Sequence, residues 1–106
     1  MAVYVHDMID WGKRIGRAGP RWTHMIADSL DELHAMAARI GLRRSWFQDK
    51  SRDKHYDIGT DRIRDLALAA GAINCDRRTF VDHMRRLRGA PPRDVGRIAF
   101  RRLLRR

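Results

Sequence analysis

The alternation of apolar and polar residues along the chain predicts short strands near its start. Residues 2–6 are mostly β-branched and aromatic, and the run ends at Asp7, so a first strand is expected there. Residues 21–28 predict a second strand, because successive side chains alternate between the two faces of a strand. Its faces would carry Trp22, His24, Ile26 and Asp28 on one side and Thr23, Met25 and Ala27 on the other. Between the two strands, residues 10–20 hold three glycines and a proline, which indicates a loop.

A first helix is indicated by apolar residues spaced three and four positions apart after Ser29. The Ser29 hydroxyl and the Glu32 carboxylate have the spacing of a capping box, and Gly41 suits the left-handed residue that follows a helix. The stripe expected to be buried is Leu30, Leu33, Met36, Ala37 and Ile40.

Further helices are expected after capping residues of the same kind. Thr60 would cap a helix that ends at Gly71, with buried residues Ile63, Leu66, Ala67 and Ala70. Asp76 would cap a helix that ends at Gly89, with inward residues Phe80, Val81, Met84 and Leu87. Residues 94–106 predict a last amphipathic helix, set apart by Pro91 and Pro92.

A third strand is expected at residues 43–48 and a fourth at residues 72–75. The order β, β, α, β, α, β, α, α predicts an α/β fold with a small sheet of about four short strands, three to four helices and some parallel pairing. An α+β arrangement of the same elements is the alternative. We expect one domain over residues 1–89 and a basic helical extension over residues 90–106.

The composition narrows the class of protein. With 106 residues and 43% hydrophobic side chains, the chain has room for one packed domain. Its longest run without charged or strongly polar residues, 66–73, is far shorter than the roughly 20 residues that span a bilayer, so no membrane partner is expected. Cys75 is the only cysteine, which excludes an intramolecular disulfide and argues against a cysteine-rich zinc site. We therefore expect a cytoplasmic protein without a cofactor.

The positive charge is concentrated toward the C-terminus. Of the formal net charge of +10, residues 1–75 contribute little, with 12 Lys or Arg against 10 Asp or Glu, whereas residues 76–106 hold 11 Arg against 3 Asp. Arginine forks onto phosphate, so the balance predicts nucleic acid as the partner, bound through phosphates without sequence specificity. The expected contacts are Lys13, Arg14, Arg17, Arg21, Arg77, Arg78, Arg85, Arg86, Arg101 and Arg102. The alternatives are an interaction protein, phage-encoded, that meets or inhibits an acidic host complex, and arginines that serve only solubility.

Polar side chains near the predicted strand ends are the candidates for chemistry: Asp7, His24, Asp28, His34, His55, Tyr56 and Asp57. His55 and Asp57 would face the same way from a strand, which suits a metal-assisted phosphodiesterase. His24 and Asp28 would stand about 13 Å apart along their strand, too far to share an ion. Because neither a His-Glu-x-x-His motif nor a pair of cysteines occurs, we expect no metal.

Metal-free chemistry on phosphodiesters or nucleotides is the second interpretation. His24 and His55 would serve as acid and base, Asp57 would complete the catalytic set, and Arg62 or Arg64 would hold the phosphate. A small enzyme of this kind is an alternative to a binding protein.

The same residues also have structural interpretations. His24 would pack in a sheet face, Asp28 would help cap the first helix, and His34 would be an ordinary half-buried residue. Aromatic residues that alternate along strands are either core residues or platforms on which bases stack. This choice applies to Trp11, Trp22, Trp46 and Phe47.

Four motifs, taken in order, resemble a known family. They are Val-Tyr-Val-His-Asp at 3–7, Arg-Trp-Thr-His-Met-Ile-Ala-Asp-Ser at 21–29 with Glu-Leu-His at 32–34, Trp-Phe-Gln at 46–48 and His-Tyr-Asp at 55–57. From residue 3 to about residue 88 the chain is similar to a small bacterial and phage family, the domain of unknown function numbered four thousand and thirty-one. The resemblance implies no activity. The chain departs from the family at His6, because the family's pattern often reads Asp-Asp where this sequence has His6 and Asp7.

Overall fold

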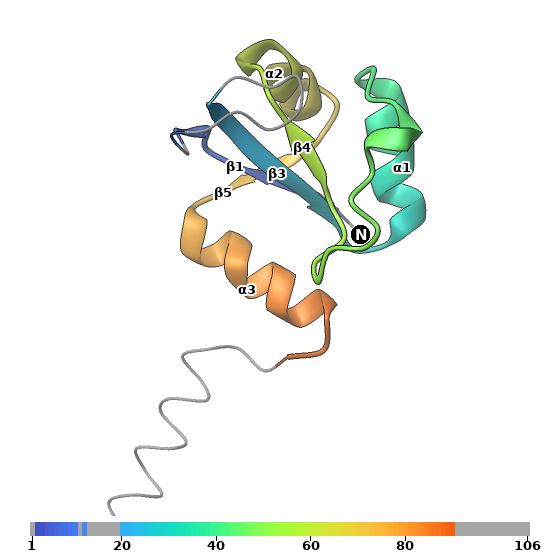
Figure 1. Cartoon of the computed structure of the whole chain (residues 1–106), viewed down its shortest axis with the longest axis vertical. Helices are drawn as coiled ribbons and strands as arrows, with labels where there is room; N and C mark the ends of the chain where they lie inside the picture. The colour runs from blue at the N-terminus through green and yellow to red at the C-terminus, as the bar shows by residue number, and fades with distance from the viewer. Residues whose placement is uncertain (1, 11, 13–19, 91–106) are drawn as a thin grey trace, which may run out of the picture.

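This computed structural model describes residues 2–10, 12 and 20–90. They fold around one mixed β-sheet (Figure 1). Its central strand, β3 (Arg21–Ala27), pairs antiparallel with β1 (Val3–His6), with the short β2 (Ile9–Asp10) and with β4 (Tyr56–Ile58). β1 also pairs in parallel with β5 (Ile73–Cys75). The described residues thus form a sheet of five short strands where about four were expected, and the small α/β fold with some parallel pairing is confirmed.

Three helices in the described residues begin where the capping signals predict. They are α1 (Leu30–Arg39), α2 (Asp61–Ala69) and α3 (Arg77–Leu87). In each, the capping side chain accepts a hydrogen bond from the backbone N–H three residues further on, which satisfies one of the unpaired donors at the helix start. The three caps are Ser29, Thr60 and Asp76.

The ends of α1 carry the two expected local features. Glu32 closes the capping box by accepting a hydrogen bond of 3.0 Å from the Ser29 hydroxyl, where the pattern predicts a bond from the Ser29 backbone. Gly41 follows the helix with a φ of 86°, in the left-handed region that glycine adopts without strain. Gly71, with a φ of 106°, does the same after α2.

The helices divide between the two faces of the sheet. α1 and α2 cover one face, and α3 lies along the other (Figure 1). The larger core, under α1 and α2, is centred on Val5, Met25, Leu33, Tyr56, Ile58 and Ala67. The smaller core, under α3, is Tyr4, Ile26, Cys75 and Phe80. Met25 and Ile26 therefore lie on opposite faces of β3, as the predicted alternation requires.

The predicted third strand at residues 43–48 is wrong. Arg44–Trp46 forms a single 3₁₀ turn, and Gln48 makes an isolated bridge to His55. β3 pairs with β4 instead, because Tyr56 and Ile58 become fully buried there, whereas the Trp46 side chain is left 42% exposed. The segment 55–58, which carries no helix or strand prediction of its own, supplies the missing strand.

Three leucines that the helical stripes place in the core are exposed: Leu30, Leu66 and Leu87. Leu30 begins α1 and Leu87 ends α3, so both lie at helix ends where the packed stripe runs out. In α2 the fully buried residue is Ala67, which turns its neighbour Leu66 toward solvent.

Several predictions concern residues outside the described part of the chain. They include the helix at 94–106, most of the loop at 10–20 and the stacking residue Trp11. The expected phosphate contacts Lys13, Arg14, Arg17, Arg101 and Arg102 also lie there. Among the residues that are described, no helix is both long and apolar enough to cross a membrane.

Phe80 joins α3 to the sheet, and its side chain is only 2% exposed. We expect Phe80→Ala to lower the free energy of unfolding by about 3–5 kcal/mol, because it leaves a cavity under α3. Leu66→Ala is the matched control, since Leu66 is 42% exposed and should change the free energy of unfolding by less than about 1 kcal/mol. Urea denaturation measures both, and equal losses would contradict the assignment of the second core.

The residues described in the two cores lie between Ala2 and Met84. We therefore expect a chain that ends after Ala90 to keep a cooperative thermal transition, as an independent domain would. Calorimetry of the shortened and full-length proteins tests this prediction. Aggregation or a broad, non-cooperative transition of the shortened protein would show that residues 91–106 belong to the fold.

Candidate functional site: a histidine and carboxylate cluster on the sheet

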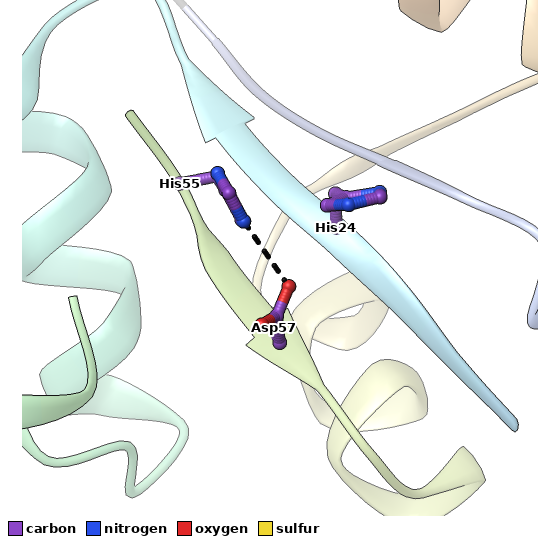
Figure 2. Close-up of side chains that lie close together, drawn as sticks. All are labelled: His24, His55 and Asp57. Atoms are coloured by element: carbon purple, nitrogen blue, oxygen red, sulfur yellow. Dashed lines mark ion pairs between the residues drawn. The ribbon is translucent and has the colours of Figure 1, made fainter. Parts of the chain in front are cut away.

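Pairing of β3 with β4 brings two histidines and a carboxylate together (Figure 2). His24 on β3 lies directly opposite Asp57 on β4, and His55 precedes Asp57 by two residues, so all three side chains point to the α3 face of the sheet. One ligand atom from each residue lies within 4.8 Å of the others. We call His24, His55 and Asp57 the central cluster. They are the three residues that the sequence selects as candidates for catalysis.

His55 and Asp57 form a largely buried ion pair. Nε2 of His55 lies 3.2 Å from Oδ1 of Asp57, and the two side chains are 12% and 15% exposed. Nδ1 of His55 donates a hydrogen bond to the backbone carbonyl of Asp53, so Nδ1 carries the proton and Nε2 faces the carboxylate. Oδ1 of Asp57 is buried, and its contact with Nε2 of His55 is a hydrogen bond only when that nitrogen carries a proton.

The two histidines of the central cluster have opposite electrostatic surroundings. Burial acts to lower the pKa of His55, but Asp57, the Asp53 carbonyl and the nearby negative charges outweigh it and raise that pKa above its usual value. For His24, burial and then the positive charge on His55 lower the pKa to about 4, with Asp57 acting in the other direction. His24 is consequently neutral at pH 7.

His6 extends the central cluster across β1. Its Nδ1 donates to the carbonyl of Asp7 at 2.7 Å, which leaves Nε2 as an acceptor. That nitrogen accepts from the backbone N–H of His24 at 3.2 Å and lies 3.0 Å from Nδ1 of His24. Nδ1 of His24 is thus the donor in the second contact.

Sequence reasoning did not select His6 as a site residue. The available signal was its position two residues after Tyr4, which puts it on the α3 face, in the register of His24. Burial, followed by the positive charges of Arg77 and Arg64, lowers the pKa of His6.

Aromatic rings enclose the histidines on the α3 side. The His6 ring packs edge-on against Phe80 with centroids 4.6 Å apart, and Trp22 packs edge-on against His24 at 4.9 Å. Trp22 is buried, so it is a core residue in this structure, whereas Trp46 is exposed with the Arg43 guanidinium 5.6 Å from its ring centre.

Two other predicted polar residues lie apart from the central cluster. His34 is half-buried on the α1 face, as the structural interpretation expects, and contacts the Tyr56 hydroxyl at 2.8 Å. Asp28 does not cap α1; its carboxylate accepts hydrogen bonds from the Ala2 backbone N–H, the Tyr4 hydroxyl and Arg86. Ser29 caps the helix, which leaves Asp28 to connect β1 and α3.

Several arginines proposed for phosphate contact have acidic partners. Arg86 lies 2.8 Å from Asp28, and Arg21 lies 3.5 Å from Asp61. Arg64 donates to the His6 carbonyl at 2.9 Å and to Asp7 at 3.1 Å, so it holds the end of β1. Arg62 is exposed on α2, and Arg77 and Arg78 are exposed on the first turn of α3.

These features define a small mixed-sheet protein with a buried His-His-Asp cluster on one sheet face. The family model described as "Protein of unknown function (DUF4031)" matches residues 3–87, and the chain belongs to this family. The match confirms the family that the four motifs suggest, and it covers all the described strands and helices. No curated protein and no solved structure gives a significant match.

The Asp28 carboxylate predicts a specific pH dependence of stability. The hydrogen bond from Arg86, followed by those from Tyr4 and Ala2, holds the pKa of Asp28 below its usual value of 3.8, although partial burial opposes this. A carboxylate with a lowered folded-state pKa adds stability above its unfolded-state pKa and loses it as pH falls through the folded-state value. Asp28→Asn should therefore cost about 1–2 kcal/mol at pH 7, since Arg86 is partly solvated, and progressively less below about pH 4.

Urea denaturation between pH 2.5 and 7 tests this prediction. Asp65→Asn is the control, because Asp65 is exposed on α2. A destabilisation by Asp28→Asn that stays the same across the whole pH range would contradict an ionic role for Asp28.

Proposed function

We propose that this protein cleaves phosphodiester bonds in nucleic acid or nucleotides, with His24, His55 and Asp57 as its catalytic residues. The observation that carries the proposal is their convergence in a largely buried cluster built from two strands. Burying two imidazoles and a carboxylate next to each other costs stability unless the groups are fully paired, and such clusters are concentrated at functional sites.

The chemistry of these side chains fits phosphodiester cleavage. The reaction needs a nucleophile held beside phosphorus and positive charge against the phosphate oxygens. Two imidazoles and a carboxylate in contact supply these either as proton acceptor and donor or as ligands of a bound cation. Both routes use the same three residues.

The charge distribution supports nucleic acid as the substrate class. The chain has a formal net charge of +10 at pH 7, and its excess of arginine begins at α3. Arg77, on the first turn of α3, is close enough for its charge to act on His6 beside the central cluster. Contacts to phosphate from such arginines hold a polyanion without reading its sequence.

Loss of either histidine should abolish turnover while the protein stays folded. RNA, single-stranded DNA, duplex DNA and cyclic nucleotides are assayed with and without divalent metal ions. We expect His24→Ala and His55→Ala to reduce the rate by about 10²–10⁴ or more, with thermal transitions that remain cooperative. His34→Ala is the matched control, because His34 is also half-buried but lies on the opposite sheet face. A wild-type protein that cleaves none of these substrates would refute the proposed activity.

Binding to nucleic acid should depend strongly on salt. With the inactive His55→Ala protein, the logarithm of affinity for duplex DNA should fall linearly with the logarithm of salt concentration, by about 0.9 per phosphate contacted. The double change of Arg77 and Arg78 to Ala should reduce that slope by about 1–2. No binding in low-salt gel shifts, or an unchanged slope in the double variant, would count against the phosphate contacts on α3.

A second candidate function is binding to an acidic protein, and one cavity favours it. The cavity, of about 350 Å³, lies between α1, the C-terminal end of α3 and the loop before β4. Apolar side chains, Leu30 and Leu87 among them, line it together with three cations, Arg52, Lys54 and Arg88, and two carboxylates, Asp28 and Asp53. Pull-down from nuclease-treated lysate tests this candidate. Binding of a protein partner by the wild type, lost in Leu87→Glu, would support it. Loss of every partner after nuclease treatment would favour nucleic acid.

A further inference from the structure

The facing atoms of His55 and Asp57 call for a positive charge between them. The Asp53 carbonyl fixes the proton of a neutral His55 on Nδ1, so Nε2 then presents a lone pair toward Oδ1 of Asp57. Two lone pairs 3.2 Å apart in a largely buried place repel each other unless a cation lies between them. A proton on Nε2 or a metal ion fills that need.

The distances fit a metal ion. In a tetrahedral zinc site with bonds of about 2.0–2.1 Å, neighbouring ligand atoms lie about 3.3 Å apart. The separation of 3.2 Å between Nε2 of His55 and Oδ1 of Asp57 is close to that value. A nitrogen of His24 lies within 4.8 Å of a ligand atom of each of the other two residues, so a small side-chain movement would complete the set.

The outer hydrogen bonds are those that metal-bound histidines use. A ligating imidazole donates its other N–H to a carbonyl, a carboxylate or a similar acceptor, which fixes the ring and its tautomer. His55 donates through Nδ1 to the Asp53 carbonyl, and His24 donates through Nδ1 to His6. In these tautomers Nε2 is the unprotonated nitrogen of each histidine. Oδ1 of Asp57 is buried, and its contact with Nε2 of His55 is favourable only when a proton or a metal ion lies between the two atoms.

We propose that His24, His55 and Asp57 bind one divalent transition-metal ion, with zinc as the first candidate. Two imidazole nitrogens and a carboxylate oxygen suit zinc, cobalt, nickel or iron, whereas magnesium and calcium prefer sites made of oxygen atoms. Three protein ligands leave a fourth position for water, which is the arrangement of hydrolytic rather than structural zinc sites. This proposal departs from the expectation from sequence that the protein holds no metal. The purpose of the ion rests on the proposed function, but its binding does not.

Cobalt and zinc titrations of the full-length, chelator-treated protein test the site. We expect one Co²⁺ per chain, with the intense visible absorption of a four-coordinate ion, and displacement by one equivalent of Zn²⁺. His24→Ala, His55→Ala and Asp57→Asn should each weaken Zn²⁺ binding by more than about 100-fold, since loss of an outer-shell partner alone costs about 10–100-fold. His34→Ala and His83→Ala are matched controls outside the central cluster and should bind like the wild type.

Thermal melts of the same variants show whether each one is folded, so that loss of metal binding is not mistaken for loss of folding. Zn²⁺ should raise the melting temperature of the wild type and both controls, and leave that of the three cluster variants nearly unchanged. Absence of stoichiometric binding to a folded wild type would overturn the metal site and assign the charge between His55 and Asp57 to a proton. Equal weakening by His34→Ala would also overturn it.

The metal site and the proposed activity fail in different ways. Stoichiometric binding that needs the three cluster residues, without cleavage of any substrate, would support the metal site and refute the activity. Cleavage that persists in chelator, by a protein that also fails to bind Co²⁺ or Zn²⁺ stoichiometrically, would support the activity and refute the metal site.

Discussion

The antiparallel pairing of β3 with β4 is the interaction on which the rest of this structure depends. It sets Met25 opposite Tyr56 and, one residue away, His24 opposite Asp57. Because side chains alternate in a strand, one register buries an apolar pair under α1 and α2 and joins a polar pair on the other face. A slip of one residue would exchange the two faces, so the core and the candidate site are specified by the same constraint.

The polar side chains on the α3 face of the sheet are stabilised by hydrogen bonds to one another and to the backbone rather than by exposure to water. His6, His24, His55 and Asp57 lie on three neighbouring strands, and backbone carbonyls of Asp7 and Asp53 accept hydrogen bonds from two of the imidazoles. Such a network rigidifies the sheet face only if its members are satisfied, and an unsatisfied buried carboxylate oxygen is costly. Oδ1 of Asp57 lies 3.2 Å from Nε2 of His55, and this pair is satisfied only when a proton or a metal ion lies between the two atoms.

Local signals in the sequence predicted much of the fold. Caps at Ser29, Thr60 and Asp76 mark helix starts because they depend on residues three positions apart, and β3 shows its alternation over seven residues. β4 escaped prediction because three residues carry little periodicity, and its strand geometry comes from pairing with a strand more than thirty residues away. The segment at 43–48 looked more like a strand, but it forms one 3₁₀ turn and a single bridge from Gln48 to His55.

The candidate site was only partly predictable for the same reason. Because His55 and Asp57 are two residues apart, the sequence predicts that they share one face of a strand, and the motif at 21–29 contains His24. Only the register of β3 against β4 shows that all three residues meet. The role of His6 depends on pairing of β1 with β3, and its tautomer depends on a carbonyl one residue away. Long-range pairing, which a single sequence does not encode in any local pattern, turned separate polar residues into a cluster.

The most direct test of whether His24, His55 and Asp57 bind one metal ion is a crystal structure of the full-length protein. The crystals are grown with Zn²⁺, and anomalous data are collected at the zinc edge. A zinc ion bound by the central cluster should give one strong anomalous peak about 2.0–2.2 Å from a nitrogen of His24, Nε2 of His55 and a carboxylate oxygen of Asp57. His6 and the Asp53 carbonyl should accept the outer hydrogen bonds. A structure in which His24 lies away from Asp57, or in which the three residues meet around no anomalous peak while Zn²⁺ binds elsewhere, would contradict it.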